Sequence, residues 1–557
     1  MADSKESAAN KAALKLTNDI RNMTNYKNFY NQVQRLVASP VVKREDFKNT
    51  LIDALKNNGL ETELRNTVFH LARSHSSALT STEYPASTTE ADLAYLRKAQ
   101  IQWERRIQKS LNSMCNELNV PLARIRPSAD RDELADKWNE LSTYDIDLSQ
   151  YRPLYAPKDF LDVLFAVRDP TYRKQPGEPG WEFGHIQIRV KTLMQLVKPF
   201  KANLFHSLII THVSISFKFS LFKKQRSFYA ELSQGVPLLG VNPSMIVLGN
   251  YSNLEVERTH LGEKVLASNH APIAQEFLKR GSPRELRGRL WSLVLGTVIK
   301  DSDAEYYEEL KGMVLQYDIM VDKLIIKDVQ LTASNDDQYF VFEDVLYKTM
   351  LCFSRDSEVL APVTTDRSAG GQVIHAVLQG KLATLENTLV FPPSGVIPFH
   401  GFTMYATPFC YLYDDPCSMY YAFRAFYLRY WFRLHTVSSH EQGIVALCLL
   451  FERLLQCHEP QLWAHFRNIH IQPVKVVFKW LMRGFSGHLP PEQLLYLWDL
   501  ILGYDSLEIV PLLAVTILSF RKENLLQVNT LHNVEAVLAD LSSLKVMPLL
   551  QLVLLKE

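Results

Sequence analysis

The chain has 557 residues, more than one compact core usually holds, so two or more domains are expected. Hydrophobic residues make up 47% and charged residues 22%, which is ordinary for a globular protein. The formal net charge is +1, which gives no electrostatic reason to expect nucleic acid or a membrane surface as a partner. The longest apolar run, Ile509–Phe520, is too short to span a bilayer, and the polar amino terminus lacks a signal peptide's apolar segment.

The six cysteines are dispersed, and none forms a C-x-x-C pair. Such a set is typical of reduced, buried thiols in a cytosolic protein. Cys410 and Cys417 have histidines nearby, but their spacing does not match a metal site. No metal and no other cofactor is therefore expected.

Residues 1–165 are expected to form a helical region. Apolar residues at three- and four-residue steps predict helices as far as residue 73, with Pro40 and Gly59 between them and a loop at Ser74–Thr89. A long helix should follow and end before Pro121. Its apolar stripe consists of Leu93, Leu96, Trp103, Ile107, Leu111, Met114 and Leu118. This stripe would either form a coiled coil with a partner or pack against the earlier helices, and the break at Ala99 and Gln100 favours packing.

Residues 166–262 show weaker order. Prolines and glycines near Asp169–Trp181 predict turns or a linker. Val213–Leu221 alternates strictly between apolar and polar residues, which predicts a strand without an evident partner. We therefore expect a poorly ordered insertion near residues 204–233, of the kind that alternative splicing introduces.

The most informative stretch runs from Arg280 to Trp291. Ser282 should cap a helix that begins at Pro283, and Glu285 would complete a capping box. One face of this helix is apolar, formed by Leu286, Leu290, Leu293 and Val294. The other faces carry Arg284, Arg287 and Arg289.

Further helices are predicted at residues 304–327, 420–434, 443–457, 472–481 and 490–499. Gly503 should end the last of these.

The string Arg280-Gly281-x-Pro283-x-x-x-Arg287-Gly288-x-x-Trp291 resembles the opening motif of the TBC domain. That family comprises all-helical GTPase-activating proteins for Rab-type small GTPases. Trp498 and Asp499, with the aromatic residues before them, look like its closing landmarks. The resemblance implies an all-α fold with a two-lobed helical domain at residues 263–525, followed by a helical tail at 526–557.

Members of this family are known for an arginine finger in an Ile-x-x-Asp-x-x-Arg motif. The resemblance places this motif on Ile325-x-x-Asp328-x-x-Leu331. Leu331 stands at the arginine position, and leucine has neither a charge nor a hydrogen-bond donor. Asp328 either has a role in the motif or is a solvated acid near a helix end.

The family's second finger is a glutamine in a Tyr-x-Gln motif. In the register fixed by the matching residues Pro408–Asp414, Pro398 stands at the tyrosine position and His400 at the glutamine position. His400 is either a partial substitute for the glutamine or a turn residue before Gly401.

Two arginines, Arg355 and Arg367, lie between the finger positions. Either would rescue catalysis if its guanidinium reached the phosphate. Arg355 also fits the position of a helix-end cation.

By resemblance, the chain activates GTP hydrolysis by a GTP-bound Rab protein in vesicle trafficking. It would be cytoplasmic and would reach endomembranes only through that GTPase. The replaced fingers support the opposing hypothesis of a catalytically inactive Rab-binding scaffold, or pseudo-GAP, in which Arg287 and Asp328 are structural or docking residues. No nucleotide-binding or hydrolase signature occurs, so the chain is not expected to be a hydrolase itself.

Overall fold

The computed structural model describes residues 17–18, 20–38, 44–79, 91–143, 146–166, 251–335, 339–360, 392–438 and 440–554. The strand expected at Val213–Leu221, the insertion expected near residues 204–233, and Arg367 lie outside these residues. Among the described residues, every helix is too short or too polar to cross a bilayer.

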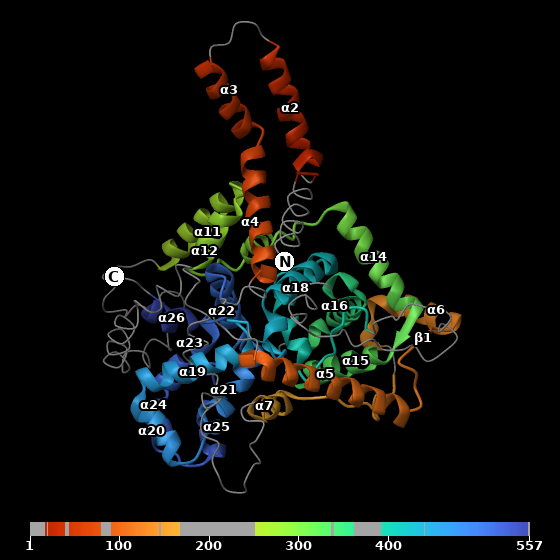
Figure 1. Ribbon diagram of the computed structural model, residues 1–557, viewed down its shortest axis with the longest axis vertical. Helices are drawn as coiled ribbons and strands as arrows, with labels where there is room; N and C mark the ends of the chain where they lie inside the picture. Colours follow the sequence, from red (N-terminus) through yellow and green to blue (C-terminus); the bar gives the residue numbers. More distant parts are fainter. Residues whose placement is uncertain are drawn as a thin grey trace.

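The amino-terminal helices project from the body of the molecule (Figure 1). They are α2 (Thr24–Val37) and α3 (Arg44–Asn57), and α4 (Leu60–Leu79) leads from α3 into the body. Gly59, with φ of 69°, separates α3 from α4, as its stop signal predicted. The loop expected from Ser74 is wrong for residues 74–79, because α4 continues to Leu79; the rest of the expected loop lies outside the described residues.

The long predicted helix is confirmed as α5 (Ala91–Glu117). The described side chains of its apolar stripe are buried or half-buried, but the packing partner differs from the expected one. Trp103 contacts Tyr155 and Phe160, with ring centroids 5.0 and 5.5 Å away. Phe160 belongs to α7 (Pro157–Ala166), which follows α5 in the chain.

The helix predicted at residues 304–327 is interrupted by a short strand. The chain forms α14 (Asp301–Gln316), β2 (Tyr317–Ile319) and α15 (Met320–Asn335). The strand exists because β1 (Ala123–Ile125), far away in the sequence, pairs with it antiparallel. This is the only strand pair in the described part of an otherwise helical chain. Helical periodicity could not reveal such a long-range partner.

The predicted capping box at Ser282 is wrong. The chain forms α11 (Tyr251–Ala267) and α12 (Ala271–Leu278), passes through turns, and begins α13 (Arg287–Leu295) only at Arg287. The Ser282 N–H donates to the carboxylate of Asp499 at 2.8 Å, so this tertiary contact holds Ser282 ahead of the helix. The apolar face of α13 is buried as predicted.

The helices predicted at residues 443–457, 472–481 and 490–499 are confirmed, with ends that differ by a few residues. The helix predicted at residues 420–434 is confirmed as far as Arg429, and a short 3₁₀ helix follows it. Gly503 lies inside α22 (Pro491–Tyr504) and does not end it; Asp505 follows in the left-handed conformation, with φ of 54°. Between β1 and α7 the chain forms α6 (Ser128–Asp136), η1 (Lys137–Asn139) and η2 (Leu141–Thr143). After α15 come η4 (Phe340–Phe342), α16 (Glu343–Arg355), η5 (Phe402–Tyr405), η6 (Thr407–Tyr411), α18 (Pro416–Arg429), η7 (Trp431–Leu434), α19 (Ile444–His458), α20 (Pro460–Asn468), α21 (Pro473–Met482), α22 (Pro491–Tyr504), α23 (Ile509–Phe520), α24 (Lys522–Leu525), α25 (Leu531–Ala539) and α26 (Val546–Leu554).

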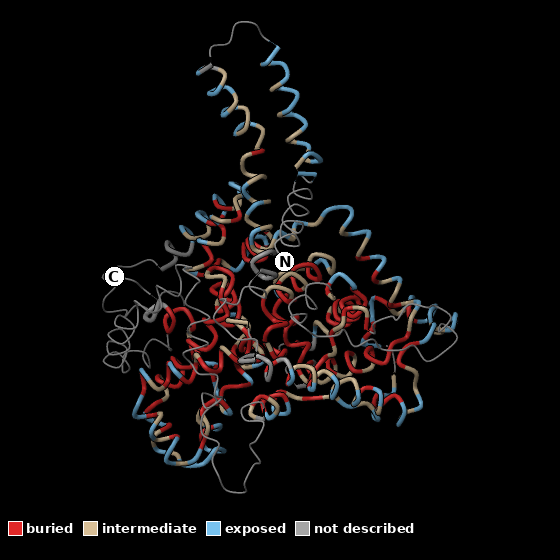
Figure 2. The backbone as a smooth tube through the Cα atoms, in the orientation of Figure 1, coloured by how far each residue is buried: buried red, intermediate tan, exposed pale blue. Residues whose placement is uncertain are grey.

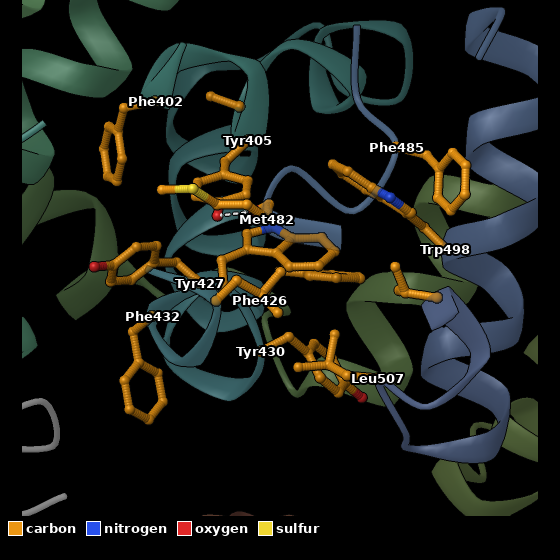
Figure 3. Close-up of a cluster of buried hydrophobic side chains, with 14 of the residues drawn as sticks. Phe402, Tyr405, Phe426, Tyr427, Tyr430, Phe432, Met482, Phe485, Trp498 and Leu507 are labelled. Carbon is orange, nitrogen blue, oxygen red and sulfur yellow. Dashed lines mark hydrogen bonds between the residues drawn. The ribbon is translucent and has the colours of Figure 1, made fainter. Parts of the chain in front are cut away.

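The buried residues are concentrated in the body, whereas the projecting hairpin of α2 and α3 is mostly exposed or half-buried (Figure 2). The body has an aromatic core, part of which is drawn in Figure 3. Within it, Tyr405 stacks on Trp431, and Trp431 meets Trp498 with ring centroids 4.7 Å apart. Tyr405 also donates its hydroxyl to the Met482 carbonyl. This core ties η5 to the helices that follow it.

Candidate functional site

The opening and closing motifs meet inside the protein. Asp499 on α22 is fully buried and accepts hydrogen bonds from Arg287 Nε at 3.0 Å and from Trp291 Nε1 at 2.6 Å. The Arg287 guanidinium also donates to the Ser282 carbonyl at 2.9 Å. A buried charge of this kind is tolerated only when it is paired and hydrogen-bonded. Arg287 therefore joins α13 to α22 and does not lie on a free surface.

The other motif residues surround this ion pair. Trp291 stacks on Trp498 with ring centroids 6.4 Å apart. Gly281 has φ of 76°, and a side chain there would meet the Tyr496 ring at 3.0 Å. Pro283 is half-buried and Arg280 is exposed. Apart from Arg280, these residues lie in or against the packed interior.

The two finger-equivalent positions lie on elements that Asp328 joins. Asp328, on α15, is 3% exposed and accepts from the Gly401 N–H at 2.6 Å. It also accepts from the Thr403 N–H at 2.8 Å and the Thr403 hydroxyl at 2.7 Å. Leu331 follows Asp328 by one helical turn, and His400 directly precedes Gly401. Because Asp328 is buried and hydrogen-bonded, it is not a solvated acid near a helix end, which was one of its two alternatives.

His400 is held by its backbone, and its imidazole is partly exposed with the Nδ1 atom buried. Its N–H donates to the Tyr155 carbonyl at 2.9 Å, and its carbonyl accepts from Arg483 Nη2 at 3.0 Å. The imidazole is 42% exposed, and its Nδ1 lies 3.9 Å from the Asp328 carboxylate. Gly401 is required here, because its φ is 92° and a Cβ would collide with the Arg483 guanidinium.

Burial is the largest influence on the pKa values of the ionisable groups around Asp328. Burial raises the pKa of Asp328 above its usual 3.8, while the hydrogen bonds from Gly401 and Thr403 and the nearby His400 oppose the shift. Burial likewise lowers the pKa of Arg483, and the Asp328 charge opposes that change. Burial, with Arg483 and Lys479, lowers the pKa of His488 to about 3, so this histidine is neutral at physiological pH.

Arg355 lies at the end of α16, but it is not an exposed helix-end cation. Its side chain is 1% exposed and forms a two-pronged ion pair with Asp322, with Nη2 and Oδ2 2.7 Å apart. Nη2 also donates to the Tyr317 carbonyl at 2.8 Å. The guanidinium therefore stabilises the junction of β2, α15 and α16 and is withdrawn from the surface.

Sequence reasoning missed three residues around His400: Tyr155, Thr403 and Arg483. Nothing local marks Tyr155, which contributes a carbonyl from far upstream. Arg483 precedes two residues with positive φ, Gly484 and Phe485, but their local sequence does not say which loop the arginine reaches. The described residues contain no group of histidine, cysteine and acidic side chains that could hold a metal ion.

The site can be compared with known proteins. A family model of the Rab-GTPase-TBC domain matches residues 399–526, which begin at the loop of His400. The human protein "TBC1 domain family member 19" is 44% identical over 534 residues, which cover 95% of each chain. A Dictyostelium discoideum "TBC domain-containing protein kinase-like protein" is 27% identical over 106 residues, which cover 19% of this chain and 10% of that protein.

Among solved structures, a crystal structure of the Chlamydomonas flagellar RabGAP TBC domain aligns with a TM-score of 0.41 and 15% identity. The alignment covers 55% of this chain and 92% of that one. The identity to the human relative extends over nearly the whole length of both proteins. This chain therefore belongs to the TBC domain family.

Proposed function

We propose that this chain binds a Rab-family small GTPase in its GTP-bound form and regulates it without supplying an arginine finger. The observation that carries the proposal is Leu331, one turn beyond the Asp328 that joins α15 to the His400 loop. An arginine supplied in trans accelerates GTP hydrolysis by roughly 10³ to 10⁵. An aliphatic side chain at that position stabilises none of the developing phosphate charge.

Arg355 is a poor replacement for the missing finger. Its guanidinium would have to leave Asp322, a carboxylate only 3% exposed, without its cationic partner. Breaking such a buried pair costs about 3–5 kcal/mol, which would offset most of the 4 to 7 kcal/mol that an arginine finger contributes.

A second function, weak GTPase activation, is supported by the exposed imidazole of His400. A neutral imidazole donates one hydrogen bond and accepts another, so it can hold a water molecule as a glutamine amide does. Because the attacking water needs orientation as well as charge stabilisation, this residue alone would restore only a small part of the rate.

A panel of purified Rab proteins tests both functions. Each would be loaded with GTP, with a non-hydrolysable analogue or with GDP, and binding and single-turnover hydrolysis would be measured with the full chain. We expect at least one Rab to bind preferentially in the GTP-like state, with hydrolysis accelerated less than roughly ten-fold. Acceleration near 10³ would establish a finger elsewhere in the chain, and no binding to any Rab would refute the proposal.

The surface used for binding can be tested in the same assay. Leu331→Glu places a charge on the proposed contact and should weaken Rab binding by roughly ten-fold or more. Leu531→Glu is the matched control, because Leu531 is 40% exposed on α25. Equal effects of the two changes would show that Leu331 does not contact the GTPase.

A further inference from the structure

A stretch of chain outside the family-matched residues 399–526 touches both finger-bearing elements. We call it the strap, residues 122–126 and 151–160. Its first part includes β1, and its second part includes Tyr155 and the start of α7. The two parts hold different elements of the candidate site.

The first part of the strap fixes the start of α15. The Met320 N–H donates to the Leu122 carbonyl and the Arg126 N–H donates to the Gln316 carbonyl, both at 2.9 Å, on either side of the β1–β2 pair. Arg124 Nε reaches Asp318 of β2 at 2.9 Å. Because β2 leads directly into α15, these bonds set the position of the helix that carries Leu331.

The second part of the strap fixes the loop of His400. The Tyr155 carbonyl accepts the His400 N–H at 2.9 Å. The Tyr155 ring packs between Trp103 and Phe399, with centroids 5.0 and 5.8 Å away. Tyr155 is 5% exposed, so its ring is anchored in the core while its backbone meets the loop.

From these contacts we infer that the strap is a positioning element for the GTPase-binding site. Asp328 and Arg483 hold the loop from the side of α15 and α21 through the Gly401 N–H and the His400 carbonyl, and the strap holds it through the His400 N–H, which belongs to the preceding peptide group. The strap thereby fixes the spacing between Leu331 and His400. The inference rests on the proposed function, and it assigns a role in that function to residues well upstream of the matched segment.

The test compares Tyr155→Ala with Tyr155→Phe in the full chain. Tyr155→Ala removes the ring that anchors the carbonyl, whereas Tyr155→Phe keeps it. Tyr30→Ala is the matched control, because Tyr30 lies on the projecting helix α2 and is 50% exposed. Hydrogen exchange of the free protein is followed at residues 399–405 and, for reference, in α22 and α23.

We expect Tyr155→Ala to raise exchange at residues 399–405 by roughly ten-fold, with α22 and α23 unchanged, and to weaken binding of the Rab found in the panel by a similar factor. Tyr155→Phe should change both readouts much less than Tyr155→Ala does, and Tyr30→Ala should leave both as in the parent chain. Unchanged exchange in the loop, or faster exchange with undiminished Rab binding, would overturn the inference.

Arg124→Ala covers the case in which Tyr155→Ala unfolds the chain. Arg124 is half exposed, so its removal leaves the core intact, and it should raise exchange at the start of α15 and weaken Rab binding. Unchanged exchange there would overturn the inference. Failure of every Rab to bind would refute the proposed function. The exchange data would still test whether the strap positions the His400 loop and α15, because exchange is measured without a GTPase.

Discussion

At the scale of single residues, the Arg287–Asp499 pair shows that a charged residue in a stretch that looks exposed can be buried by a distant partner. Arg287 sits among arginines that the sequence assigns to exposed faces of a helix. Two of them, Arg284 and Arg289, are indeed exposed, whereas Arg287 is 1% exposed. The difference arises from Asp499, which lies on α22 far along the chain and which no local pattern around Arg287 reveals.

Arg287→Ala should destabilise the protein by about 3–5 kcal/mol, because it leaves the Asp499 carboxylate buried without its cation. Arg289→Ala, on the exposed face of the same helix, should change stability by less than about 0.5 kcal/mol. Urea denaturation of the two variants measures the difference. A small effect of Arg287→Ala would mean that Trp291 and Ser282 suffice to stabilise the acid.

At the scale of elements, the sequence predicts helices well and their junctions poorly. The described side chains in the stripe of α5 are buried or half-buried, and the apolar face of α13 is buried, as the periodicity indicates. The break at β2 and the late start of α13 both depend on partners more than a hundred residues away, Ala123 and Asp499. Single-sequence periodicity contains no information about such pairs.

The contact of α4 with the body should weaken in acid. Burial, followed by the nearby Arg429 and Arg73, lowers the pKa of His70 from 6.5 to about 4. His70 packs against Gly296 beyond α13, and Arg73 faces Asp505. Since the pKa is lower in the docked state, docking is strongest above pH 6.5 and is lost progressively as the pH falls toward 4.

At pH 5 this linkage amounts to at most about 2 kcal/mol. Hydrogen exchange in α4, corrected for intrinsic rates, should therefore accelerate between pH 7 and pH 5 relative to α22. His70→Phe keeps a ring at the contact without a titrating group and should remove this acid sensitivity. If α4 in that variant responded to acid as the parent does, His70 would not be the group responsible.

Two helical glycines offer a matched pair for testing helix packing. A Cβ at Gly503 of α22 would lie 2.7 Å from the Lys279 backbone nitrogen at the end of α12, whereas a Cβ at Gly312 of α14 meets nothing within 4 Å. Gly503→Ala should therefore destabilise the protein by about 1–3 kcal/mol. Gly312→Ala should stabilise it by about 0.5–1 kcal/mol through helix propensity. Thermal denaturation measures both, and equal effects would show that α12 and α22 can separate without cost.

At the scale of the whole molecule, described residues from before and after the expected TBC domain at 263–525 pack against it. Tyr155 bonds to His400, and Gln493 on α22 accepts the Val546 N–H of α26 at 3.0 Å. The family resemblance could indicate the motifs, and it proposes the finger positions, because these are local strings. It could not show that the upstream strap and the last helix are built into the same body, since those contacts join residues that are distant in sequence.

If the whole scaffold is a competent GTPase groove that lacks only its fingers, restoring them should restore catalysis. Leu331→Arg with His400→Gln returns a cation and an amide to elements that Asp328 already joins. Against the Rab that binds in the panel, the double variant should accelerate single-turnover hydrolysis by at least roughly 10²-fold, below the 10³ to 10⁵ of an evolved finger. Leu331→Met with His400→Gln controls for the loss of leucine, since it supplies no charge and should remain slow. Tight Rab binding without any gain in rate would show that the groove holds the GTPase with its phosphate out of reach of residue 331.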